Sequence, residues 1–323
     1  MPFQRIAGAF HVTNYSPDGD TIRFAPADPD RLAALDGPPA KINGRGHVSL
    51  RLEGIDALET HYSGQKQPAA FADGATDALL AHLGIGDIVW ADERRSVVSA
   101  DDGVEGHILA RGCDKYGRVI ALAFPGAGDG DGEVFVEADH LDGSANRMLL
   151  REGLAYPTFY WSLFADLRDA LGAASGDARD AGRGLHAEDR TTAGFEVLSL
   201  ASITDDHVIL PKLFRRLVTY LESAGSVEGF KAALEASAEP VFDLRDRNFT
   251  HFDTFIEQDG ATIRLHRDPE ELVFDPMPAR VGTDFDALVE AAAAPFADLA
   301  SAPPEDRTFP ARVAALKSVM RRG

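Results

Sequence analysis

The stretch that most constrains the fold is residues 48–54, where a strand pattern stops abruptly. Val48, Leu50 and Leu52 alternate with polar residues, which is typical of a strand with one buried face. Gly54 then ends the alternation, since glycine readily adopts the backbone conformations that a turn requires. We therefore expect a short buried strand that opens into a loop.

Charged residues gather at the end of this strand. Arg51 lies on its polar face, and Asp56 and Glu59 follow in the loop. Charged residues at a strand end are usually just solvated, so this segment alone indicates little. Its interest depends on two other charged segments.

Those two segments have the pattern of hairpin turns. Residues 18–21, Asp-Gly-Asp-Thr, join strand-like stretches within residues 10–24. Residues 114–118, Asp-Lys-Tyr-Gly-Arg, join strand-like stretches within residues 108–122. Each turn carries a glycine where the chain needs a positive φ. A polar turn needs no function, but the order of the three segments is informative.

The chain presents an acidic turn, then an arginine-bearing strand with Asp and Glu, then a turn that ends in arginine. This order resembles that of the staphylococcal (micrococcal) nuclease family, also called thermonucleases. A closing pattern at residues 149–155 and 184–189 extends the resemblance, which covers about residues 12–189. It implies an α+β fold in which residues 1–190 form an OB-fold five-stranded β-barrel with packed helices.

The resemblance also implies a calcium site. Asp20 and Asp56 would supply side-chain ligands, and Ala57 would supply its backbone carbonyl. Such hard oxygen ligands suit Ca²⁺. The best-known member has threonine at the position of Ala57, but a carbonyl ligand survives that change. Leu58 replaces a proline that is common at this point.

Three residues carry the catalytic roles that the resemblance implies. Glu59 would act as general base on the attacking water. Arg51 and Arg118 would hold the phosphate, because a guanidinium offers two parallel donors. The expected function is therefore a calcium-dependent nuclease that hydrolyses phosphodiester bonds in DNA, RNA or both.

Three further residues are candidates for substrate binding. Lys115 and Tyr116 resemble the family's contacts to a terminal phosphate of a bound nucleotide. Tyr160 lies in an aromatic cluster at residues 156–161 and is a candidate for stacking a base. Core packing explains aromatic residues in that cluster equally well.

Residues 25–47 are longer than the corresponding loop in the simplest members of the family. Prolines and glycines flank a short helical pattern at residues 30–35. Lys41 and Arg45 in this insertion could touch substrate, although a surface loop is the simpler interpretation.

Composition limits the possible environments of the protein. Hydrophobic residues make up 45% of the 323 residues, an ordinary globular balance, and no apolar run is long enough for a membrane span. The N-terminus lacks a signal-peptide pattern, and Cys113 is the single cysteine, so we expect a cytoplasmic location. The net charge of −20 is unusual for a protein that binds nucleic acid.

The remaining elements follow from apolar periodicity and from glycine and proline boundaries. Within the first 190 residues, the patterns predict helices at residues 69–83, 145–152 and 162–183 and short strands at 88–90, 97–98 and 134–136. Residues 126–132 have too few acids for a calcium loop and are expected to form a flexible turn.

Residues 191–323 lie beyond the resemblance and are expected to form an α+β domain of unassigned fold. The patterns predict helices at 210–221, 227–234, 284–300 and 310–322 and a hairpin of residues 252–257 with 262–266. His251, Asp253 and His266 could be imagined as metal ligands, but polar side chains on an exposed sheet face are the favoured interpretation.

Two functions of different class remain open. One is the nuclease, and the other is a non-catalytic module of the same barrel type that binds nucleic acid or protein. The charged set that the resemblance requires for catalysis is complete, with Asp20, Arg51, Asp56, Glu59 and Arg118 all present. This favours the enzyme, because a module that only binds has no chemical need for all five residues. We also expect a fragment that ends near residue 195 to fold and to keep activity.

Overall fold

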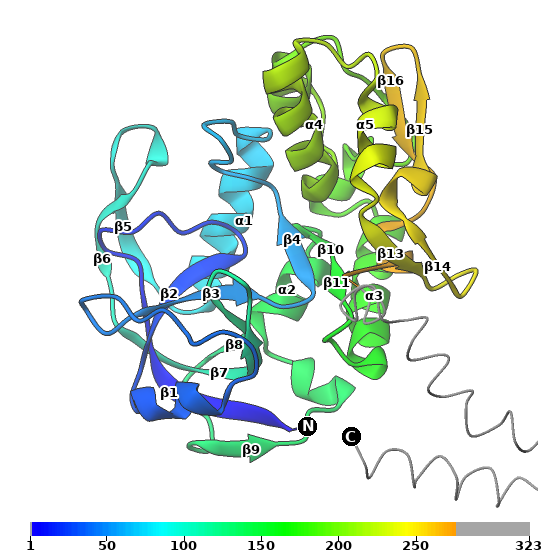
Figure 1. The fold of residues 1–323 in the computed structure, drawn as a ribbon. Coiled ribbons are helices and arrows are strands. Elements are labelled where there is room, and N and C mark those ends of the chain that lie inside the picture. The colour runs from blue at the N-terminus through cyan, green and yellow to red at the C-terminus, as the bar shows by residue number, and fades with distance from the viewer. Residues whose placement is uncertain (1, 276–323) are drawn as a thin grey trace, which may run out of the picture. The chain divides into compact units, whose positions relative to one another are not determined.

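The computed structural model describes residues 2–275, and residues 2–274 form one compact unit of mixed α and β structure. A closed barrel of five strands occupies one part of this unit (Figure 1). Its strands pair in the order β1–β2–β3–β8–β7 and back to β1, and all pairs are antiparallel except β3 with β8. The strands are β1 (Phe3–His11), β2 (Thr21–Pro26), β3 (Val48–Leu52), β7 (Val104–Cys113) and β8 (Val119–Pro125).

Gly8 marks the point where β1 changes partner. Residues before it pair with β9 (Gly132–Val134), whereas residues 8–11 pair with β2. A Cβ atom at Gly8 would lie 2.2 Å from the carbonyl oxygen of Ala25 and 2.6 Å from the Phe24 ring. The close approach of β2 that closes the barrel therefore requires glycine here.

The register of the barrel strands determines which side chains share the outer face of the barrel. Arg23 on β2 lies opposite His11 on β1 and Ser49 on β3, and Thr21 lies opposite Arg51. Directly opposed residues point to the same side of a sheet, so Arg23 and Arg51 share this face in adjacent rows. The alternate residues, such as Leu50, fill the barrel core and are fully buried.

Three α-helices pack on the barrel. They are α1 (Ala69–His82), α2 (Ala145–Arg151) and α3 (Ala165–Asp180). Asn146 on α2 fixes this packing, because its Nδ2 donates to the carbonyls of Glu53 and Ala121 and its Oδ1 accepts from the backbone N–H of Ala123. Smaller pairs of strands flank these helices: β4 (Ile55–Ala57) with β10 (Ala155–Pro157), and β5 (Gly86–Trp90) with β6 (Val97–Asp101).

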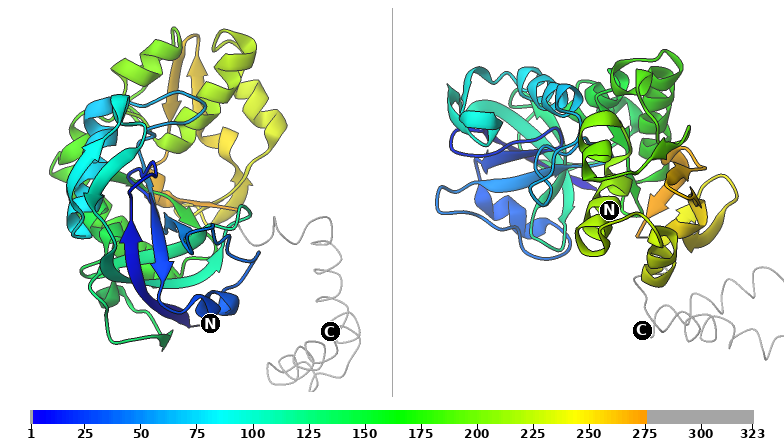
Figure 2. Two further views of the ribbon diagram at one scale, coloured as in Figure 1. Left: turned by 90° about the vertical axis from the view of Figure 1, so that its left-hand side faces the viewer. Right: turned by 90° about the horizontal axis from the view of Figure 1, so that it is seen from above.

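The later part of the chain adds two helices and two small sheets (Figure 2). The helices are α4 (Pro211–Ala224) and α5 (Phe230–Ser237). One sheet contains β11 (Phe159–Tyr160), β17 (Leu272–Phe274), β13 (Pro240–Asp243) and β14 (Asn248–His251). The other contains β12 (Phe195–Glu196), β16 (Thr262–Leu265) and β15 (Ile256–Asp259).

Short helical turns complete the fold. The 3₁₀ turns are η1 (Pro29–Ala34), η2 (Asp92–Arg94), η3 (Ala138–Leu141), η4 (Gly184–Ala187), η6 (Phe252–Phe255) and η7 (Pro269–Glu271), and η5 (Ser202–Asp206) is a π-helical turn. Among the described residues, no helix is both long and apolar enough to cross a membrane.

The expected boundary at residues 190–191 falls inside this compact unit. β11, from the first part of the chain, pairs in parallel with β17 near its described end. A second hydrophobic core includes Leu58, Tyr156 and Leu185 together with residues from α4 and α5. The two parts of the chain therefore share both a sheet and a core.

Most of the elements predicted within the described residues are present, with two differences. The strand expected at 134–136 ends at Val134, and Phe135 is 78% exposed. Residues 252–255 form a 3₁₀ turn instead of the start of a hairpin, so Asp253 does not share a strand with His251. The helices predicted at 284–300 and 310–322 lie outside the described residues.

Candidate functional site

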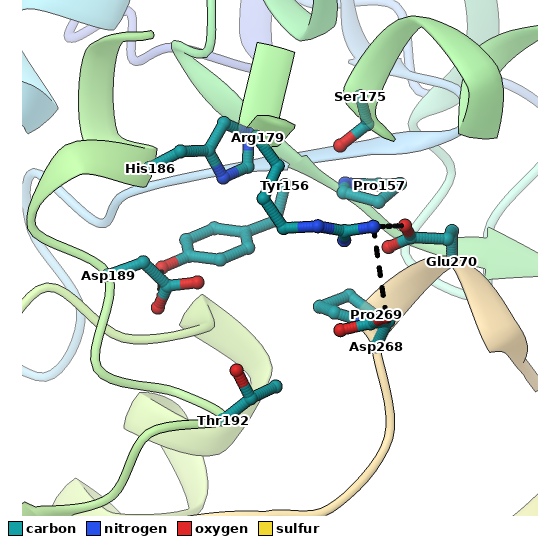
Figure 3. Close-up of a pocket in the computed structure, with 10 residues that line it drawn as sticks. All are labelled: Tyr156, Pro157, Ser175, Arg179, His186, Asp189, Thr192, Asp268, Pro269 and Glu270. Carbon is teal, nitrogen blue, oxygen red and sulfur yellow. Dashed lines mark hydrogen bonds and ion pairs between the residues drawn. The ribbon is translucent and has the colours of Figure 1, made fainter. Parts of the chain in front are cut away.

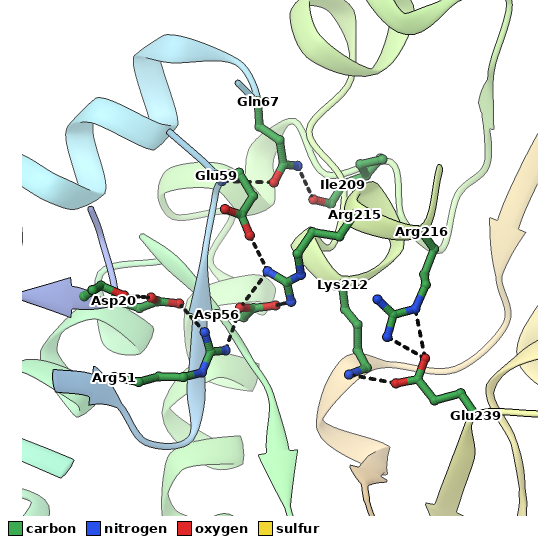
Figure 4. Close-up of polar contacts among 11 residues, drawn as sticks. Asp20, Arg51, Asp56, Glu59, Gln67, Ile209, Lys212, Arg215, Arg216 and Glu239 are labelled. Atoms are coloured by element: carbon green, nitrogen blue, oxygen red, sulfur yellow. Dashed lines mark hydrogen bonds and ion pairs between the residues drawn. The ribbon is translucent and has the colours of Figure 1, made fainter. Parts of the chain in front are cut away.

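The structure brings four of the predicted site residues together at one end of β3 (Figure 4). Arg51 Nη1 lies 3.6 Å from Asp20 Oδ2, and Arg51 Nη2 lies 3.0 Å from Asp56 Oδ1. Glu59 follows β4 and faces the same group of charges. The acidic turn and residues 51–59, two segments that lie apart in the sequence, thus converge on a single cluster.

The acidic turn is held against the strand that bears Asp56. A Cβ atom at Gly19 would lie 2.5 Å from Ala57 Cβ, so only glycine allows this contact. The backbone N–H of Leu52 donates to the carbonyl of Asp20, and Thr21 Oγ1 donates to Asp20 Oδ1 at 2.9 Å. This packing places Asp20 beside Ala57, the predicted third metal ligand.

Arg215 on α4 enters the same cluster from the opposite side. Its Nη2 lies 2.7 Å from Asp56 Oδ2, its Nη1 lies 3.2 Å from Asp56 Oδ1, and Nη1 also donates to Glu59 Oε1. Figure 4 shows the Asp56 carboxylate between the guanidinium groups of Arg51 and Arg215. Both carboxylate oxygens of Asp56 therefore accept from an arginine.

These contacts determine how the acids titrate. Burial alone would raise the pKa of Asp56, but Arg215 and Arg51 outweigh it and hold that pKa below its ordinary value. Burial raises the pKa of Glu59; Arg215 opposes the change, and the Asp56 and Asp20 carboxylates add to it. Glu59 is therefore a stronger base than an exposed glutamate.

Asp18 adds a fourth carboxyl group to the cluster. Burial and the neighbouring Asp20 and Glu59 carboxylates raise its pKa well above the ordinary value. This raised pKa favours the neutral form of Asp18, and the other three carboxylates, when ionised, exceed the two guanidinium groups by one negative charge. Oxygen donors with an excess of negative charge are the ligands that a hard cation prefers.

No group of three or more His, Cys, Asp or Glu side chains within residues 2–275 is arranged as a ready-made metal site. In this cluster the reason is visible, since the oxygens of Asp56 face Arg51 and Arg215. The alternative ligand set of His251, Asp253 and His266 is likewise not assembled, and His266 lies 3.7 Å from Glu257.

The second predicted arginine lies on the neighbouring turn. Arg118 Nε donates to Asp114 Oδ2 at 2.7 Å, and within the described residues Arg118 forms no ion pair with Asp20, Asp56 or Glu59. Tyr116 is 58% exposed, with the Lys115 Nζ 5.1 Å from its ring centre. This turn is accessible but is not joined to the cluster by a direct contact.

Tyr160 lies closer to the cluster but is covered on one side. Its ring centre lies 5.4 Å from Lys212 Nζ and 6.3 Å from the Phe274 ring. Lys212 is itself 4% exposed and pairs with Glu239. The later part of the chain therefore occupies part of the space beside Tyr160 that a stacked base would need.

Sequence reasoning missed two residues that shape the cluster. Arg215 is one, and Gln67 is the other, because its Oε1 accepts from the backbone N–H of Glu59. Arg215 is the first of two consecutive arginines in an amphipathic helix pattern, which weakly indicates a charged helix face. The pattern does not indicate that Arg215 contacts Asp56 and Glu59. Gln67 carried no recognisable signal.

A separate small cavity is lined by Tyr156, Arg179 and Glu270, among other residues outside the cluster (Figure 3). Tyr156 O–H donates to Asp189 at 2.7 Å, and Arg179 pairs with Glu270 across the cavity. Its volume is about 10 Å³, which is the space for a single water molecule. The cavity is too small for a nucleotide, so the carboxylate–arginine cluster is the candidate site.

Comparisons with known proteins do not identify the chain. No protein-family model matches the sequence, and no curated protein matches it.

Proposed function

We propose that this protein is a calcium-dependent phosphodiesterase that cleaves nucleic acid, built on an OB-fold-like barrel of the micrococcal nuclease type. One observation carries the proposal. Asp20, Arg51, Asp56 and Glu59, which the family resemblance assigns to one active site, lie in one cluster although two separate segments, the acidic turn and residues 51–59, supply them. Packing alone does not require an arginine and three carboxylates to meet here.

The residues present fit a calcium ion in charge and donor type. Asp20 and Asp56 would provide carboxylate oxygens and Ala57 its carbonyl, since Gly19 packs the acidic turn against Ala57. When bound, the cation would neutralise charge on the phosphate and make the phosphorus easier to attack.

The chain's own side chains would do the remaining work. Glu59 would take a proton from the attacking water, for which a raised pKa is favourable. Arg51 would donate to phosphate oxygens as negative charge builds on them. Arg118 would join it by turning from Asp114, a change that its 30% exposed side chain permits.

The outer face of the barrel supports a nucleic-acid substrate despite the net charge of −20. Arg23 shares this face with Arg51, and the guanidinium groups of Arg23 and Arg45 lie 5.0 and 5.4 Å from the ring centre of Tyr15. In the part of the chain that the structure describes, neither arginine pairs with a carboxylate. A local surface of cations and an aromatic ring suits a phosphate chain with stacked bases.

The second candidate is a non-catalytic binding module. Two contacts favour it: Arg215 neutralises Asp56 and Glu59, and Arg118 pairs with Asp114. This function would use the barrel face without any hydrolysis.

A cleavage assay separates the two candidates. The full chain is incubated with single- and double-stranded DNA and RNA, with calcium or with excess chelator. We expect cleavage of at least one substrate that requires calcium. Binding without cleavage under every condition would favour the module, and undiminished cleavage in chelator would remove Asp20 and Asp56 from the metal role.

A further inference from the structure

Arg215 comes from a part of the chain that the family resemblance does not cover, yet it makes the closest contacts to the proposed metal ligands. Its guanidinium spans Asp56 with distances of 2.7 and 3.2 Å and also bonds Glu59. The side chain is 16% exposed, and that of Asp56 is fully buried. This is a desolvated, bidentate ion pair, the strongest form of the arginine–carboxylate contact.

The oxygens of Asp56 limit what else can bind there. Oδ1 accepts from both Arg51 and Arg215, and Oδ2 accepts from Arg215. Arg215 therefore takes the oxygen that Arg51 leaves free. A cation could not ligate Oδ2 in this arrangement without meeting a positive charge 2.7 Å away.

We propose that Arg215 is an internal competitor of the divalent cation, so that α4 holds the carboxylate site in a closed state. The inference rests on the proposed function, because it concerns the same Asp56. Metal binding would require the Arg215 side chain to leave Asp56 and Glu59, and the C-terminal part of the compact unit would thereby set the metal affinity of the barrel site.

The packing of α4 indicates that the side chain moves rather than the helix. Leu213, Phe214 and Leu217 on α4 are fully buried in the second core. A separate anchor holds the same helix, since Lys212 and Arg216 both pair with Glu239 (Figure 4). Loss of the Arg215 contacts therefore leaves α4 attached by its apolar face and by Glu239.

The neighbouring arginine offers a matched control. Arg216 is the next residue on α4 and also forms a bidentate contact, but its partner is Glu239 and not a proposed metal ligand. Arg216→Gln removes a charge from the same helix without freeing Asp56.

The test is calcium titration by calorimetry of the full chain, with no substrate present. Arg215→Gln keeps a polar side chain and removes the charge, and Arg215→Ala is a second variant. We expect both to bind calcium about tenfold tighter or more than the wild type, and Arg216→Gln to match the wild type. Thermal unfolding gives a second readout, because calcium should raise the Tm of the Arg215 variants more than that of the wild type.

The outcomes separate this inference from the proposed function. Equal or weaker calcium binding by the folded Arg215 variants would overturn the competition while leaving a metal site in place. If neither the wild type nor any variant binds calcium, the metal site itself is wrong, and both proposals fail. If Arg216→Gln tightens binding as much as Arg215→Gln, the effect is one of overall charge and the inference is wrong.

Discussion

Gln67 Nε2 donates a hydrogen bond of 2.8 Å to the carbonyl oxygen of Ile209, and this buried contact joins the loop after β4 to the start of α4. The same side chain accepts from the backbone N–H of Glu59 through Oε1 at 3.1 Å. One amide therefore positions both the proposed general base and the segment that leads to Arg215.

Gln67→Ala should weaken stability and activity together. The substitution leaves the buried carbonyl of Ile209 without its donor and frees the backbone at Glu59, at a cost of about 1–3 kcal/mol in the free energy of unfolding. Urea denaturation measures the first effect and a calcium-dependent cleavage assay the second. Gln65→Ala is the control, because Gln65 lies in the same loop and its side chain makes no hydrogen bond within residues 2–275. Equal effects of the two substitutions would contradict a positioning role for Gln67.

Glu53 should make the stability of the protein depend on pH. Burial raises its pKa to about 7, against the opposing influence of Arg111 and of a hydrogen bond from Ser162. Between pH 4.5 and 7, Glu53 is protonated in the folded state and ionised in the unfolded state. The contribution of Glu53 to the free energy of unfolding therefore falls as the pH rises from 4.5 to 7. A shift of this size corresponds to roughly 3 kcal/mol.

Glu53→Gln should therefore stabilise the protein at pH 8 much more than at pH 5. We expect the difference between the two pH values to be about 2–3 kcal/mol in urea denaturation. Glu105→Gln, at an exposed position near the start of β7, is the control for the loss of a carboxylate. A stabilisation by Glu53→Gln that is equal at both pH values would show that Glu53 is ionised in the folded state throughout.

A chain that ends at residue 195 should lose its cooperative fold. The truncation removes β17, the partner of β11, and exposes Leu58, Tyr156 and Leu185, which pack in the second core. This outcome differs from the sequence-based expectation of a separable first domain. Near-ultraviolet circular dichroism and thermal unfolding would compare it with a chain that ends at residue 275. A sharp transition and full dichroism in the shorter chain would show that the barrel folds without the later segments.

Local patterns were sufficient for much of the fold. Alternation identified the strand at 48–52, and helical spacing identified α1 and α4, because each buries one apolar face. The sequence was less informative where short aromatic runs had two interpretations. Phe252 and Phe255 are both buried at a spacing of three, which suits a 3₁₀ turn, whereas alternation suggested a strand.

The candidate site was only partly predictable, for a physical reason. Asp20, Arg51, Asp56 and Glu59 lie in or beside turns whose glycines leave a local signal. Arg215 has no such signal, because what distinguishes it from Arg216 is the direction in which α4 faces, and tertiary packing alone decides that direction. Arg118 pairs with Asp114 and does not contact the cluster, and the sequence of the turn does not indicate this partner.

The central claim is that Glu59 is the base of a phosphodiesterase, and Glu59→Gln tests it most directly. Glutamine keeps the shape of the side chain and an oxygen that can accept from Arg215, so the cluster should stay assembled. Glu222→Gln, at an exposed glutamate on α4, controls for loss of a carboxylate elsewhere.

The measurement is the initial rate of nucleic-acid cleavage in calcium, together with nucleotide affinity. We predict that Glu59→Gln lowers the rate by roughly two to four orders of magnitude while nucleotide affinity changes little. Glu222→Gln should cleave like the wild type. Cleavage by Glu59→Gln at the wild-type rate, in a preparation free of contaminating nuclease, would contradict the claim.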